Sequence, residues 1–88
     1  MTPANLPGGD LIETIRKAVK QLGKEDGTYR FTAFEKKGMA DTVYSYAQAD
    51  IRTSQNEIAR IGINYLLADY KLNGASSVLA RVLERLNA

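Results

Sequence analysis

The stretch that decides the fold of this chain is Thr28-Tyr29-Arg30-Phe31-Thr32-Ala33-Phe34. It is rich in aromatic and β-branched residues, and its side chains alternate, which predicts a β-strand. One side of that strand would carry Tyr29, Phe31 and Ala33, and the other Arg30, Thr32 and Phe34. A lone strand leaves its backbone groups without ladder partners, and the chain offers no convincing second strand. We therefore expect either that this strand pairs with its copy in another chain or that the segment is not a strand.

Apolar residues recur at helical spacing on both sides of this segment. The pattern predicts helices over about residues 11–22, 39–51 and 54–71, and a last helix that begins at residue 75 or 76. Ser54, with Glu57 three residues later, predicts the N-cap of the third helix, and Thr53 is the alternative cap. The expected fold class is thus mostly α, with four helices and one short strand. Residues 1–9 are expected to form a flexible leader, and residues 10–88 a single helical domain.

The composition excludes several classes of protein. The chain has 88 residues, no cysteine and no histidine, so it has no disulfide, no thiolate zinc site and no histidine base. No pair of carboxylates is singled out by its spacing, so we expect no enzyme, no metal and no cofactor. No apolar run approaches the roughly 20 residues that cross a bilayer, and no signal peptide is apparent, so we expect a cytoplasmic protein without a membrane partner. Because so small a domain buries only about 60% of its unfolded surface, the remaining means of stabilisation is a second copy.

The order of strand, helix and helix resembles the ribbon-helix-helix family of DNA-binding proteins over roughly residues 28–72. The residues that carry the resemblance are Tyr29-Arg30-Phe31-Thr32 in the strand and the run from Ser54 to Leu67, which opens Ser-Gln-Asn-Glu-Ile-Ala-Arg. The resemblance implies a homodimer whose paired strands enter the major groove of double-stranded DNA, with extra helices at both ends of the chain. It implies base contacts from Arg30 and Thr32, and phosphate contacts from Arg52, Ser54, Gln55 and Asn56. A repressor, an antitoxin or a plasmid-accessory protein would fit.

The charges leave an alternative function open. The net charge is +2, with +2 over residues 1–24, −2 over residues 25–50 and +2 over residues 51–88, so the basic excess lies outside the expected ribbon. Arg16, Lys20 and Lys24 form a basic row that is either a solvated helix face or a track for phosphates. The alternative to a DNA-binding protein is a non-enzymatic protein-interaction module, a helical adaptor whose apolar faces bind a protein partner.

Overall fold

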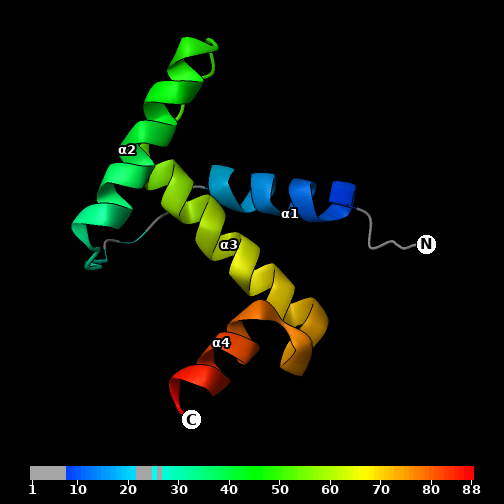
Figure 1. The fold of residues 1–88 in the computed structure, drawn as a ribbon. Coiled ribbons are helices and arrows are strands. Elements are labelled where there is room, and N and C mark those ends of the chain that lie inside the picture. Colours follow the sequence, from blue (N-terminus) through cyan, green and yellow to red (C-terminus); the bar gives the residue numbers. More distant parts are fainter. Residues whose placement is uncertain (1–7, 22–24, 26) are drawn as a thin grey trace.

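The computed structural model describes residues 8–21, 25 and 27–88 of the chain. It contains the helices α1 (Gly8–Lys20), α2 (Ala33–Gln48), α3 (Gln55–Asn73) and α4 (Val78–Leu86), and a 3₁₀ turn, η1 (Gly74–Ser76), between the last two (Figure 1). The predicted mostly α fold is confirmed. No β-strand occurs in the ranges described.

Helix α3 is the element on which the other helices pack. α1 lies across it, α2 meets it near its first residues, and α4 folds back along its last turns (Figure 1). Its 19 residues span about 28 Å at the α-helical rise, so α2 and α4 contact opposite ends of one rod. The helices therefore form an open arrangement around α3 and not a closed bundle.

The prediction of a strand at residues 28–34 is wrong, because the N-cap and the first turn of α2 form there. α2 begins at Ala33, six residues before the predicted start at Met39, so Phe34 is helical. Thr32 is the N-cap: its Oγ1 accepts a hydrogen bond from the Glu35 amide at 3.0 Å, and its own amide donates to Glu35 Oε1 at 2.8 Å. This reciprocal capping box satisfies two backbone donors within one turn, whereas a strand would need a distant partner. Residues 27–32 precede it without regular secondary structure.

The end of α2 also differs from the prediction. The helix stops at Gln48 and not at Ile51, because Asp50 adopts the left-handed conformation with a φ of 61°. The Ile51 amide then donates to Tyr46 O at 2.9 Å and the Asp50 amide to Ala47 O at 3.1 Å. These two bonds are the Schellman termination, in which Asp50 takes the place usually given to glycine.

The caps of α3 and α4 follow local rules. The predicted N-cap Ser54 is confirmed, since its Oγ accepts from the Glu57 amide at 3.0 Å. Glu57 itself accepts a hydrogen bond from the Thr53 hydroxyl at 2.7 Å. α4 begins at Val78, two or three residues later than predicted, because Ser77 is its N-cap and η1 occupies the residues before it.

The first helix begins earlier than predicted. Gly8 and Gly9, assigned to the leader by the sequence, lie in α1, and residues 1–7 of that leader fall outside the described residues. The predicted end at Leu22 also falls outside them, while α1 itself ends at Lys20. No helix in the described ranges is both long and apolar enough to span a bilayer.

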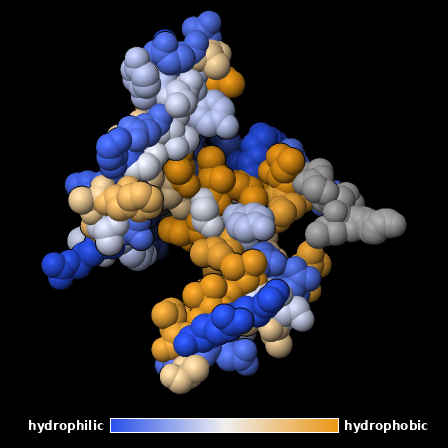
Figure 2. Space-filling model, viewed as in Figure 1, coloured by the Kyte–Doolittle hydropathy of each residue, from blue (hydrophilic) through white to orange (hydrophobic). Residues whose placement is uncertain are grey.

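A single chain leaves nearly all of its apolar side chains in contact with solvent. Ser77 is the one buried residue among those described, and seventeen large apolar side chains are 41–86% exposed. The chain exposes 7383 Å², whereas a folded monomer of this mass exposes about 5100 Å². Its radius of gyration is 15.0 Å, against about 12 Å for a compact domain of this length. Figure 2 shows apolar residues running along α3 and α4 beside a notch that separates α4 from α2.

Replacing the N-cap residue of α2 tests whether Thr32 caps a helix and does not belong to a strand. Thr32→Ala removes the acceptor for the Glu35 amide, and we expect the free energy of unfolding to fall by about 1 kcal/mol. Thr32→Ser keeps the hydroxyl and is expected to stay within a few tenths of a kcal/mol of the wild type. Urea unfolding followed by circular dichroism measures both. An unchanged Thr32→Ala variant would contradict the capping box.

Candidate nucleic-acid interface

The segment before α2 forms one wall of a groove of about 760 Å³. Tyr29 and Phe31 line it, and the facing walls come from Lys36 and Met39 of α2 and from the first turns of α3. The α3 residues in the lining are Gln55, Asn56, Ala59, Arg60 and Ile63. Tyr29 and Phe31 remain 72% and 48% exposed, so the groove covers them only in part.

The two predicted base-contacting residues lie outside this groove. Arg30 lies between Tyr29 and Phe31 but does not line the groove, as expected if successive side chains point to opposite sides. It is exposed and has no hydrogen bond or ion pair with the described residues. Thr32 uses its hydroxyl oxygen to cap α2, so that oxygen holds a structural bond in addition to any contact with a ligand.

Three of the four predicted phosphate-contacting residues lie together at the start of α3. Gln55 and Asn56 occupy its first turn and line the groove opposite Tyr29, and Ser54 is the N-cap. The first amides of a helix have no intrahelical acceptor, and the positive end of the dipole favours an anion there. Arg52 precedes this turn and lines a different groove, between α1 and α3.

Arg60 joins the end of α1 to α3, a role that the sequence did not predict. Its guanidinium donates to Val19 O at 2.7 Å and to Ala18 O at 3.0 Å. These carbonyls lie in the last turn of α1, where backbone acceptors lack intrahelical donors and a cation complements the helix dipole. Arg60 therefore fixes the C-terminal end of α1 beside the first turns of α3.

The groove between α1 and α3 has a volume of about 470 Å³ and combines apolar and basic residues. Its apolar lining is Ile12, Ile15, Val19 and Ile61, and its charged lining is Arg16, Lys20, Arg52 and Glu57. Arg16 donates to Glu13 Oε1 at 3.0 Å, and this hydrogen bond lowers the pKa of the Glu13 carboxyl below its usual value. Lys20 and Arg52 form no ion pair with the described residues.

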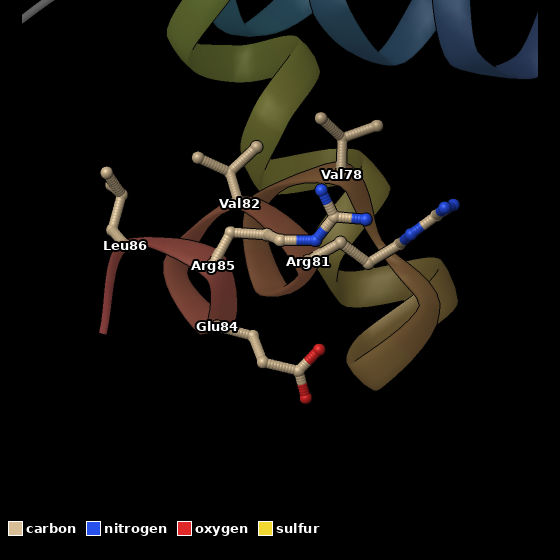
Figure 3. Close-up of a pocket in the computed structure, with 6 residues that line it drawn as sticks. All are labelled: Val78, Arg81, Val82, Glu84, Arg85 and Leu86. Atoms are coloured by element: carbon tan, nitrogen blue, oxygen red, sulfur yellow. The ribbon is translucent and has the colours of Figure 1, made fainter. Parts of the chain in front are cut away.

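The outer face of α4 is a second uncovered surface. Figure 3 shows Glu84 pointing to one side of the helix and an apolar ridge on the other, made of Val78, Val82 and Leu86. Arg81 and Arg85 lie along one edge of this ridge. Behind α4, Asp69 of α3 accepts from the Val78 amide at 2.8 Å and from the Asn73 side chain at 2.7 Å, so it anchors the turn between the two helices.

No known protein that resembles this chain was found. The chain matches no protein-family model, no curated protein and no solved structure. Within the part of the chain that the structure describes, no three acidic side chains gather as metal ligands would.

Removing the Arg60 guanidinium is expected to release α1. Arg60→Ala breaks two charge-assisted hydrogen bonds that are partly buried, and the free energy of unfolding should fall by about 1.5–3 kcal/mol. Hydrogen exchange of the α1 amides should accelerate more than that of α3. The matched control is Arg81→Ala on α4, an exposed arginine without an ion pair in the described residues. Equal protection of α1 in both variants would show that Arg60 does not hold the helix.

Proposed function

We propose that the protein is a homodimer that binds double-stranded DNA, with the segments around Arg30 from two chains paired as an antiparallel ribbon in the major groove. The observation that carries the proposal is the exposed, irregular segment 27–32, followed directly by two capped helices. In the ribbon-helix-helix family a strand precedes two helices, and the irregular segment holds the place of that strand here. A two-stranded ribbon fits the major groove.

The exposed surface supports a dimer. The chain exposes about 2300 Å² more than a folded monomer of its mass. Obligate dimers bury about 1000–2500 Å² per partner, so one such interface would cover the excess. The exposed apolar side chains give that interface the composition that obligate dimers have.

The backbone of the segment supports pairing between two copies. Residues 28–31 make no backbone hydrogen bond within the described chain, so their N–H and C=O groups are available to a ladder. Tyr29 and Phe31 line the groove toward α2 and α3, and Arg30 does not. In a ribbon this alternation directs the aromatic residues toward the helices and Arg30 toward base edges, where arginine pairs bidentately with guanine.

A second candidate function, a protein-interaction module, is favoured by the face of α4. The ridge of Val78, Val82 and Leu86 is 49–74% exposed, and its edge carries Arg81 and Arg85. A two-fold pairing of this face with its copy would bring arginine edges together, which is unfavourable. An apolar partner helix with an acidic edge fits better. Binding to DNA releases condensed counterions, which makes the affinity depend steeply on salt. A weak dependence of the affinity on salt would therefore favour this module.

The solution mass tests the dimer. We expect twice the chain mass of 9.7 kDa in light scattering coupled to size exclusion. Phe31→Glu places a charge where the aromatic side chain lines the groove, so it should shift the protein toward monomer. Phe34→Glu, at an 86% exposed position outside that groove, is the matched control and should remain dimeric. A monomeric wild type would remove the ribbon.

Arg30→Ala tests the base contact. On a duplex chosen by selection from random sequence, we expect a loss of about 1–3 kcal/mol in binding free energy, or roughly 5- to 150-fold in Kd. Dimerisation and weak binding to unrelated duplexes should persist. Fluorescence anisotropy gives both affinities, and Arg81→Ala serves as the control arginine. Absence of any duplex binding by the wild type at low salt would refute the proposed function.

A further inference from the structure

We propose that α1 extends the DNA-contacting surface, with Lys20 as an additional phosphate contact beside Arg52. The inference rests on the proposed function, because it names further residues of the same interface. It assigns a role to Lys20, one member of the predicted basic row of Arg16, Lys20 and Lys24. Arg16 of that row pairs with Glu13, and Lys24 lies outside the described residues.

The C-terminal end of α1 lies beside α3. Arg60 binds the last carbonyls of α1, so the end of that helix is fixed beside the first turns of α3. Lys17 and Lys20 lie in the last turn of α1. The same contact that holds α1 therefore brings its basic end to the part of α3 where Ser54 and Asn56 lie.

Two basic side chains from different parts of the sequence meet in one groove. Lys20 of α1 and Arg52 of the loop before α3 line one groove although they are 32 positions apart in the sequence. Glu57 is the acidic residue of that lining, and its carboxylate already accepts the Thr53 hydroxyl. Neither cation has a carboxylate partner among the described residues, so a phosphodiester that passes between them would be attracted to both.

The mixed apolar and basic lining of the groove favours DNA over a protein partner. The apolar lining of Ile12, Ile15, Val19 and Ile61 offers nothing to a phosphate, but it supports the aliphatic stems of Lys20 and Arg52. The charged groups of these two side chains would then contact a DNA backbone that passes outside the groove. A protein partner seated in the groove would instead bury those isoleucines and depend little on salt.

The experiment measures the Kd of a labelled 30-base-pair duplex of mixed sequence at several NaCl concentrations. Each lost phosphate contact lowers the slope of log K against log[salt] by about 0.9 and raises Kd about fivefold near 0.15 M salt. We expect this change for Lys20→Ala. Lys20→Arg keeps the charge and should bind as the wild type does. The matched control is Lys71→Ala, an exposed lysine in the last turn of α3.

Three results would overturn the inference. If Lys20→Ala binds with the wild-type slope while Arg52→Ala is weakened, α1 makes no contact and the proposed function stands. If Lys71→Ala lowers the slope as much as Lys20→Ala, net charge and not position explains the effect. If the wild type binds no duplex, the inference and the proposed function fail together. Circular dichroism of each variant confirms that the helices are intact.

Discussion

The packing of three helices on α3 is the constraint on which the rest of the structure depends. In a closed bundle each helix touches two neighbours and shields their apolar faces. Here α1, α2 and α4 each meet α3, but they do not close around it, so their outer faces and much of α3 remain in solvent. The exposed apolar surface is therefore a property of the topology and not of a few misplaced side chains. The second chain of the proposed dimer would cover part of it.

Local rules predicted the helices well where one signal acted alone. Ser54 and Glu57 predicted the start of α3, and the Ser54 cap is present. At Thr32 two signals overlapped, since alternation of aromatic and β-branched residues favoured a strand and the Thr32–Glu35 spacing favoured a cap. The cap prevails within one chain because its hydrogen bonds are local, whereas a strand needs a ladder partner. The strand prediction was wrong at Thr32, Ala33 and Phe34, which form the N-cap and the first residues of α2.

The positions of α1 and α4 could not be predicted from the sequence. The acceptors of Arg60, Ala18 O and Val19 O, lie 42 and 41 positions away in the sequence. Asp69 of α3 likewise anchors the start of α4, because its carboxylate accepts a hydrogen bond from the Val78 amide. Neither role leaves a periodic signal, because each depends on where a distant backbone end arrives. Helix existence is a local property, and helix placement is not.

Basic residues that are far apart in the sequence lie in one groove of the structure. Along the sequence the basic excess lies in residues 1–24 and 51–88, apart from the segment that would enter the groove. In space, Arg60 brings the basic end of α1 to the start of α3, so Lys20 and Arg52 line one groove. In the acidic middle, Glu35 accepts the Thr32 amide and Asp41 pairs with Lys37 at 2.8 Å. The free positive charge therefore lies nearer to the candidate interface than the order of residues indicates, and a net charge of +2 understates the field that a phosphate backbone would meet there.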